Sequence, residues 1–180
     1  MVNHTSDEHP WFIESKSSKA SAKRDWYIWA DPKPDGSEPN NWESIFNGST
    51  WEFDESTKQY YFHLFSKKQP DLNWENPDVR QAVFDMMNWW FEKGIDGFRV
   101  DAITHIKKNF EAGDLPIPDG KKFAPAFDVD MNQPGIQEWL QEMKDKSLSR
   151  YDIMTVGEAN GVTPNDAEEW VCLLYTSDAA

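Results

Sequence analysis

Residues 76–157 alternate helical and extended patterns, and this alternation restricts the fold more than any other feature of the chain. The segment NPDVRQAVFDMMNWWFEKG (76–94) begins with Asn76 as a helix cap, has Pro77 in its first turn and ends at Gly94. Its apolar residues recur at helical spacing: Val79, Val83, Met86, Met87, Trp90 and Phe91. We expect this helix to bury one face against a sheet.

A strand, a loop, a second helix and another strand follow in order. The strand lies within GIDGFRVDAITHI (94–106), and the second helix is QPGIQEWLQEMKDK (133–146). That helix has Pro134 in its first turn and Ile136, Leu140 and Met143 on one stripe. It leads into the strand YDIMTVGEA (151–159). Strands that alternate with helices favour parallel pairing and an α/β architecture.

The first of these strands carries charge inside an apolar run. Arg99 and Asp101 alternate with Phe98 and Val100, so the two charged side chains face the same side. In a half-exposed sheet that side would be solvated. In a closed parallel barrel it would point into the barrel, where stability alone seldom justifies a desolvated ion pair. Asp101 then ends the strand, which is where barrel enzymes place their chemistry.

Glu158 ends the second strand on the same side as Val156. A surface glutamate is the ordinary interpretation of this residue alone. Adjacent parallel strands lie about 4.8 Å apart, which would place the Asp101 and Glu158 carboxyls about 5 Å from each other. A retaining glycosidase uses two carboxyls at that separation. Arg99 favours an ionised Asp101 as the nucleophile, whereas Glu158 has no basic residue nearby in sequence and would keep its proton as the acid.

Residues 5–75 differ in composition from the rest of the chain and are rich in Asn, Asp, Pro, Ser and aromatic residues. Strand-like pieces such as DWYIWA (25–30) and YYFHLF (60–65) lie between turn signals. We expect a small, irregular, partly antiparallel excursion from the α/β fold.

Charge and cysteine content exclude several classes of partner. The net charge of -14 repels phosphate backbones and anionic membranes, so we expect neither nucleic acid nor lipid to bind. Cys172 is the single cysteine, which excludes an internal disulfide. No apolar run is long enough for a membrane span or a signal peptide, and we expect a bacterial-type cytoplasmic protein.

Four motifs in order resemble those of glycoside hydrolase family 13, the α-amylase family. They are MVNHTS at the start, QPDLNWENPDVR (69–80), GFRVDAITH (97–105) and VGEA (156–159). With DWYIW and YYFHLF, they resemble the α-glucosidase and oligo-1,6-glucosidase branch over residues 1–171. The resemblance implies a (β/α)8 TIM barrel that hydrolyses α-linked glucose from short oligosaccharides with retention of configuration.

The resemblance also implies a division of the chain. Residues 1–4 would end the third barrel strand, and 5–75 would form a small irregular α+β domain inserted after it. Residues 76–171 would hold the fourth and fifth strands. The segment 172–180, with CLLYTSDAA, fits no pattern of the family and is interpreted as a non-native tail.

Functional residues follow from the same resemblance. Asp101 would be the nucleophile, Glu158 the acid/base, Arg99 the partner of the nucleophile and His4 a hydrogen-bonding residue around the cleaved sugar. Phe65 and Gln69 would line the sugar pocket. His4 as an ordinary loop histidine and Phe65 as a core residue are the alternatives. In this branch, Ala102 after the nucleophile favours α-1,4 over α-1,6 linkages because it leaves room beside the cleaved bond.

The chain departs from the family in what it lacks. It begins inside the expected third strand, so the loop that carries calcium or magnesium in many relatives is missing, and we expect no metal or cofactor here. The His-Asp motif of the family is also missing, and we expect the chain alone to be inactive. A trehalose-6-phosphate hydrolase or a sucrose-isomerising enzyme is an alternative within the family. A non-catalytic transporter heavy chain is an alternative of another class, although such proteins typically lose the catalytic carboxylates.

Overall fold

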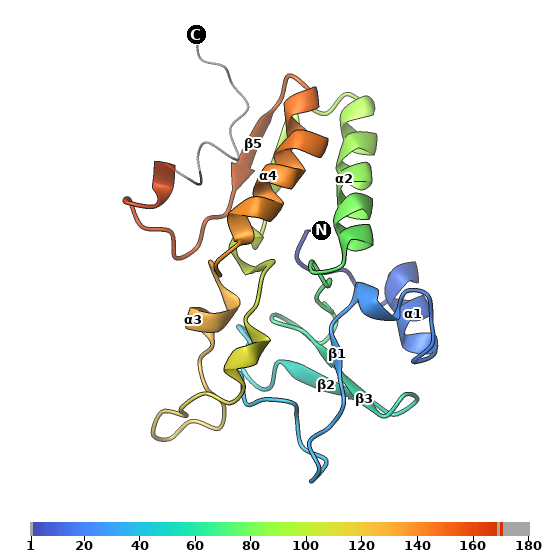
Figure 1. The fold of residues 1–180 in the computed structure, drawn as a ribbon, viewed down its shortest axis with the longest axis vertical. Coiled ribbons are helices and arrows are strands. Elements are labelled where there is room, and N and C mark those ends of the chain that lie inside the picture. Colours follow the sequence, from blue (N-terminus) through green and yellow to red (C-terminus); the bar gives the residue numbers. More distant parts are fainter. Residues whose placement is uncertain (1, 169, 171–180) are drawn as a thin grey trace. The chain divides into compact units, whose positions relative to one another are not determined.

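The computed structural model describes residues 2–168 and 170, which divide into two compact units. The parallel unit comprises Met1–Asn3, Pro77–Lys108 and Asp130–Ala180. The antiparallel unit comprises His4–Asn76 and Asn109–Val129, so it takes in a segment that the sequence analysis had assigned to the barrel part. Figure 1 shows the elements of both units along the chain.

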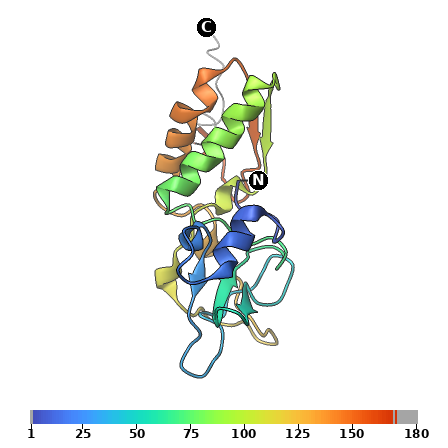
Figure 2. The same cartoon turned by 90° about the vertical axis from the view of Figure 1, so that its right-hand side faces the viewer.

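The parallel unit contains two helices and two strands in the expected order. Helix α2 (Pro77–Glu92) precedes strand β4 (Gly97–Val100), and helix α4 (Ile136–Lys146) precedes strand β5 (Met154–Gly157). The strands pair in parallel with Gly97 opposite Met154 and Val100 opposite Gly157. Figures 1 and 2 show α2 and α4 side by side, with both strands along one side of the helix pair. The predicted parallel α/β pairing is therefore confirmed.

The buried face of α2 differs in part from the prediction. Val79, Val83, Met87 and Phe91 are buried as expected, but Phe84 is also buried and was not predicted. Trp90 was predicted for the core and is 43% exposed, so that prediction was wrong. Trp90 lies in the last turn of α2, where its ring meets the exposed Trp89 ring edge to face, with centroids 4.7 Å apart.

Helix α4 buries the predicted stripe and one more aromatic residue. Ile136, Leu140 and Met143 are buried, and Trp139 joins them. Pro134 precedes the helix and is not in its first turn, because Gly135 takes a left-handed conformation (φ 85°) as the N-cap. Glycine adopts this conformation without the steric cost that a Cβ would bring. The short helix α3 (Phe127–Asp130) ends the loop before this helix.

The antiparallel unit contains the antiparallel pairing that the sequence predicts for residues 5–75. Strands β1 (Trp29–Ala30), β3 (Gln59–Phe62) and β2 (Trp51–Asp54) form an antiparallel sheet in that order. Helix α1 (Pro10–Ser17) begins with proline, and the His9 side chain accepts a hydrogen bond from the Trp11 amide. A hydrophobic core in this unit consists of the buried residues Trp42, Trp51, Phe62, Leu64, Ala126 and Val129.

The strand predicted at 25–30 is shorter than expected, because Arg24–Trp26 forms a 3-10 turn and only Trp29–Ala30 pairs with β3. Within the part of the chain that the structure describes, no helix is both long and apolar enough to cross a membrane.

Candidate active site

The register of β4 and β5 brings the ends of the two strands together. Arg99 lies opposite Val156, and the Glu158 amide donates to the Val100 carbonyl at 2.9 Å. Asp101 and Glu158 therefore each follow directly after the paired region. Met154 and Val156 are exposed and Thr155 is buried, which confirms the predicted alternation of faces along β5.

One guanidinium contacts both carboxylates. Arg99 Nη1 lies 2.6 Å from Asp101 Oδ1, and Arg99 Nη2 lies 3.2 Å from Glu158 Oε1. The planar fork of arginine suits this arrangement, because its nitrogens diverge toward two acceptors at fixed angles. Glu158 has no basic residue nearby in sequence, but Arg99 contacts it in the folded chain. Its neighbour is distant in sequence and is brought close by the parallel register.

The charged side chains are also more solvated than expected inside a barrel. The side chains of Arg99 and Asp101 are 61% and 62% exposed, whereas that of Glu158 is 37% exposed. Within the described residues, the sheet that carries them has two strands and does not enclose them. Glu158 is therefore the less solvated of the two carboxylates.

Ala102 occupies an unusual backbone conformation directly after Asp101. Its φ and ψ are 53° and 29°, in the left-handed region that residues with a Cβ rarely adopt, and it is buried. The turn leads into Ile103–His105, where His105 Nδ1 donates to the buried Asp130 carbonyl at 3.1 Å. In this conformation the Ala102 amide lies 3.4 Å from Glu158 Oε2. The turn therefore offers Glu158 a second donor besides Arg99.

The remaining predicted site residues form a second group in the antiparallel unit. The Gln69 amide donates to His4 Nε2 at 3.0 Å. The His4 and Phe65 rings lie 5.3 Å apart between centroids. His4 is placed by an isolated antiparallel bridge to Asp71. The structure thus brings His4, Phe65 and Gln69 together, and it brings Arg99, Asp101, Ala102 and Glu158 together in the other unit.

Phe46 is a residue of this second group that the sequence analysis missed. Its side chain is 62% exposed and meets the Phe65 ring edge to face, with centroids 5.9 Å apart. The turn Asn47–Gly48 that follows it has positive φ at both residues. The available signal was an aromatic residue directly before Asn-Gly, a pair that favours a tight turn.

No metal centre is formed by the described residues: none of them make a group of three or more histidine, cysteine, aspartate or glutamate side chains that could hold an ion. The Asp101 and Glu158 carboxylates are instead neutralised in part by Arg99.

Comparison with known proteins places this geometry in context. The catalytic domain of the alpha-amylase family matches residues 1–174. The chain is 64% identical over 170 residues to the probable oligo-1,6-glucosidase 3 of Bacillus subtilis, covering 94% of this chain and 30% of that protein. It is 58% identical over 176 residues to the oligo-1,6-glucosidase of Parageobacillus thermoglucosidasius, covering 98% of this chain and 30% of that enzyme.

Solved structures agree with the sequence comparison. The trehalose-6-phosphate hydrolase of Bacillus licheniformis superposes with a TM-score of 0.86 at 47% identity, covering 94% of this chain and 30% of that one. The isomaltulose synthase of Erwinia rhapontici NX5 gives a TM-score of 0.86 at 43% identity, covering 97% and 31%. The chain thus spans about 30% of the length of the relatives it matches. Because the match to the catalytic domain, a (β/α)8 barrel, runs through residues 1–174, the chain belongs to the alpha-amylase family.

Proposed function

We propose that the chain is a portion of a retaining α-glucosidase that removes terminal α-linked glucose from short oligosaccharides. The observation that carries the proposal is the contact of one guanidinium, Arg99, with two carboxylates at the ends of adjacent parallel strands. Two carboxyl groups held close together are the chemical requirement of glycoside hydrolysis with retention. The names of the relatives support the same substrate class.

Asp101 is assigned as the nucleophile and Glu158 as the acid/base. Asp101 attacks the anomeric carbon while Glu158 protonates the leaving oxygen, and a covalent glycosyl intermediate forms on Asp101. Glu158 then takes a proton from water, which attacks the same carbon and releases glucose. The assignment follows the shorter contact of Arg99 with Asp101, 2.6 Å against 3.2 Å, because a close guanidinium favours the ionised carboxylate.

The rest of the proposed site depends on the complete barrel. In this proposal the chain supplies the third to fifth strands, and residues 5–75 form the domain inserted after the third strand. His4 contacts both Phe65 and Gln69, and in this proposal the three residues line the pocket for the cleaved sugar. Small α-glucosidic oligosaccharides are the proposed substrates.

A chimera tests the catalytic assignment. Residues 1–170 of this chain replace the matching segment of the Bacillus subtilis relative, to which the chain is 64% identical. We expect the chimera to hydrolyse α-glucosides, and Asp101→Asn or Glu158→Gln to lower kcat by about 10³-fold or more. Full activity in either variant, or a covalent glycosyl intermediate trapped in Asp101→Asn, contradicts the assignment.

The proposed linkage preference is α-1,4 over α-1,6, and it depends on Ala102. Its small side chain is already buried, so a larger one must displace neighbours beside the carboxylates. We expect the chimera to prefer maltose to isomaltose, and Ala102→Val to move the ratio of kcat/KM toward isomaltose by about tenfold. Ala102→Gly is the matched control, since it tolerates the same backbone conformation and adds no bulk.

An oligo-1,6-glucosidase is the second candidate, favoured by the names of the relatives at 64% and 58% identity. Isomaltose hydrolysed much faster than maltose by the unmodified chimera supports this candidate and overturns the α-1,4 preference. Trehalose-6-phosphate and sucrose belong in the same substrate panel. A trehalose-6-phosphate hydrolase and an isomaltulose synthase are among the solved structures that superpose on this chain.

A further inference from the structure

Two Asn-Gly pairs occur in the chain, and the structure gives them different surroundings. Asn47–Gly48 lies in the antiparallel unit and Asn160–Gly161 in the parallel unit. All four residues are exposed. An asparagine side chain is attacked most readily by the next backbone nitrogen when glycine follows, because glycine has no Cβ to obstruct the approach. The sequence alone therefore makes both pairs equally reactive.

Asn47–Gly48 lies at the tip of a short hairpin. The antiparallel bridge between Glu43 and Ser49 closes the hairpin, and the Ser44 amide donates to the Gly48 carbonyl at 2.9 Å. Asn47 and Gly48 both have positive φ, 68° and 85°. Among the described residues, no hydrogen bond reaches the Asn47 carbonyl or leaves the Gly48 amide. The peptide group between the two residues is therefore not held.

This peptide group has room to turn over. A Cβ at Gly48 would meet no atom within 4 Å, and glycine adopts negative φ as readily as positive φ. Turning the peptide group over rotates ψ of Asn47 and φ of Gly48, and this rotation carries the Gly48 nitrogen toward the Asn47 side chain. That side chain makes no hydrogen bond to the described residues that would hold it away.

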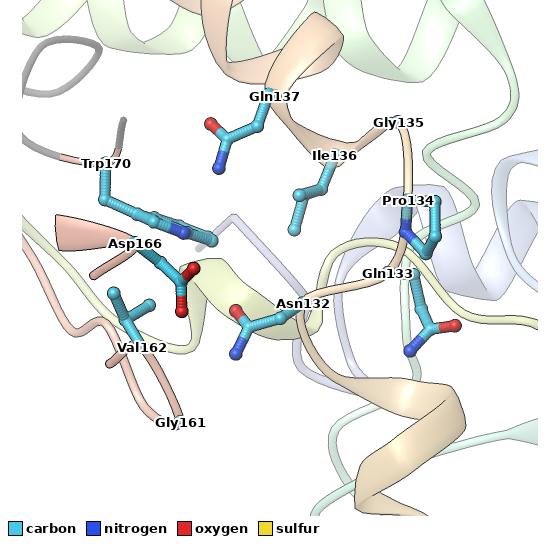
Figure 3. Close-up of a pocket in the computed structure, with 10 residues that line it drawn as sticks. All are labelled: Asn132, Gln133, Pro134, Gly135, Ile136, Gln137, Gly161, Val162, Asp166 and Trp170. Atoms are coloured by element: carbon cyan, nitrogen blue, oxygen red, sulfur yellow. The ribbon is translucent and has the colours of Figure 1, made fainter. Parts of the chain in front are cut away.

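The peptide group of the second pair is held in place. Asn132 Nδ2 donates to the Asn160 carbonyl at 3.1 Å, and this carbonyl belongs to the same peptide group as the Gly161 nitrogen. A Cβ at Gly161 would clash with Met131 Cε and lie 3.0 Å from Asn132 Nδ2. Figure 3 shows the Asn132 side chain directed toward the loop that carries Gly161 and Val162. Turning this peptide group over breaks a hydrogen bond that the first pair lacks.

We infer that Asn47 is a site of spontaneous deamidation and that the folded chain protects Asn160 from the same reaction. The Gly48 nitrogen gives up its proton and bonds to Asn47 Cγ, the bond from Cγ to Nδ2 breaks, and ammonia leaves. The product is a succinimide ring. Water then opens the ring at either carbonyl, which gives aspartate or, where the main chain continues through the side-chain carboxyl, isoaspartate. Water is the co-reactant, and no oxidation or reduction takes place.

The inference does not depend on the proposed hydrolysis. It does change the surface next to Phe46, whose ring meets Phe65 edge to face with centroids 5.9 Å apart. Deamidation of Asn47 adds a carboxylate directly after Phe46, and isoaspartate also lengthens the main chain of the hairpin by one methylene group. An aged chain therefore carries a new negative charge and an altered turn beside the contact of Phe46 with Phe65.

Peptide mapping by mass spectrometry of the 180-residue chain, incubated at mildly alkaline pH, tests the inference. Methylation by an isoaspartyl methyltransferase identifies isoaspartate among the products. We expect Asn47 to react about tenfold faster than Asn160 in the folded chain, because release of the Asn160 peptide group breaks one hydrogen bond. In guanidinium chloride we expect similar rates at the two residues, since glycine follows each of them and the fold is lost.

Asn132→Gly isolates the hydrogen bond that protects Asn160. Asn132 has a φ of 51°, so glycine keeps the backbone conformation while the donor to the Asn160 carbonyl is removed. We expect Asn160 to react about tenfold faster in this variant and Asn47 to react at its original rate. Asn47→Gln is the control for the site, because the longer side chain would have to close a larger ring, and the product at this position is expected to disappear.

Equal rates at Asn47 and Asn160 in the folded chain overturn the inference, as does a slower reaction at Asn47. A faster reaction at Asn47 that persists unchanged in guanidinium chloride assigns the difference to local sequence and overturns the role of the fold. An unchanged rate at Asn160 in Asn132→Gly overturns the protection assigned to that hydrogen bond. An inactive chimera would contradict the proposed hydrolysis and leave each of these rates unaffected.

Discussion

Arg99 is the residue on which the geometry of both carboxylates depends. Its two terminal nitrogens contact Asp101 and Glu158 separately, an arrangement that the single ammonium of lysine cannot reproduce at the same distances. We predict that Arg99→Lys lowers kcat of the chimera about 10²-fold, with a smaller change in KM, because one charge-assisted contact is lost. Steady-state kinetics on maltose measure both constants.

Arg80→Lys is the matched control for this prediction. Arg80 pairs with Glu142 on α4 at 2.6 Å and contacts neither Asp101 nor Glu158 in the described ion pairs. An equal loss of kcat in Arg80→Lys and Arg99→Lys would show that the effect comes from general destabilisation, which contradicts the proposed role of Arg99.

His63 makes the stability of the antiparallel unit depend on pH. Burial lowers the pKa of His63, although the Asp71 charge and a backbone hydrogen bond at Phe65 oppose the shift. As pH falls through about 6.5, the unfolded chain binds a proton that the folded chain does not, so folding stability falls. We predict that Tm drops between pH 7.5 and 5.5, and that His63→Gln reduces this drop. Equal pH dependence in both proteins, measured by thermal unfolding, contradicts the prediction.

Arg24 connects several elements of the antiparallel unit. Its guanidinium donates to the Ser15 carbonyl of α1 at 3.0 Å and to Thr57 Oγ1 at 3.1 Å, and it stacks 3.4 Å over the Trp29 ring of β1. We predict that Arg24→Lys lowers the free energy of unfolding by about 2 kcal/mol, since lysine lacks the planar fork. Urea unfolding followed by circular dichroism measures the change. Arg150→Lys, at an exposed residue, is expected to alter it by less than about 0.5 kcal/mol.

The long elements were predictable from sequence because each repeats one pattern many times. Helix α2 has 16 residues and α4 has 11, and the apolar stripe of each identifies the buried face. The errors concern single residues of α2: Trp90 in the last turn is exposed, and Phe84 beside the predicted stripe is buried. Strand β1 has two residues, which are too few to show an alternation of apolar and polar side chains. Its position depends on pairing with Tyr60 and Tyr61 of β3.

The candidate site was predictable along each strand, and the spacing of adjacent parallel strands predicted that Asp101 and Glu158 lie close together. Alternation placed Arg99 with Asp101 on one strand and Glu158 with Val156 on the other, and each pair is two residues apart. The Arg99–Glu158 contact depends on the register between β4 and β5, which no local pattern encodes. The left-handed turn at Ala102 was equally hidden, because alanine has no preference for that conformation and the surrounding packing imposes it.

At the scale of the whole molecule, the open side of the β4–β5 sheet is the surface most exposed to association. Met154 is 61% and Val156 43% exposed, and the sheet has these two strands alone within the described residues. Apolar side chains beside unpaired strand edges are a template for pairing with another chain. We predict that the 180-residue chain self-associates with rising concentration, and that Met154→Thr with Val156→Thr reduces the association, because threonine suits a strand and is less apolar.

Sedimentation velocity over a range of concentrations measures this association. Ile117→Thr is the matched control, since Ile117 is 46% exposed but lies in a loop without a strand edge beside it. Equal reduction by Ile117→Thr would assign the association to exposed apolar area in general. A chain that stays monomeric at all concentrations would contradict the prediction and show that the charge of -14 outweighs the attraction at the open face, because like charges repel at every approach of two copies.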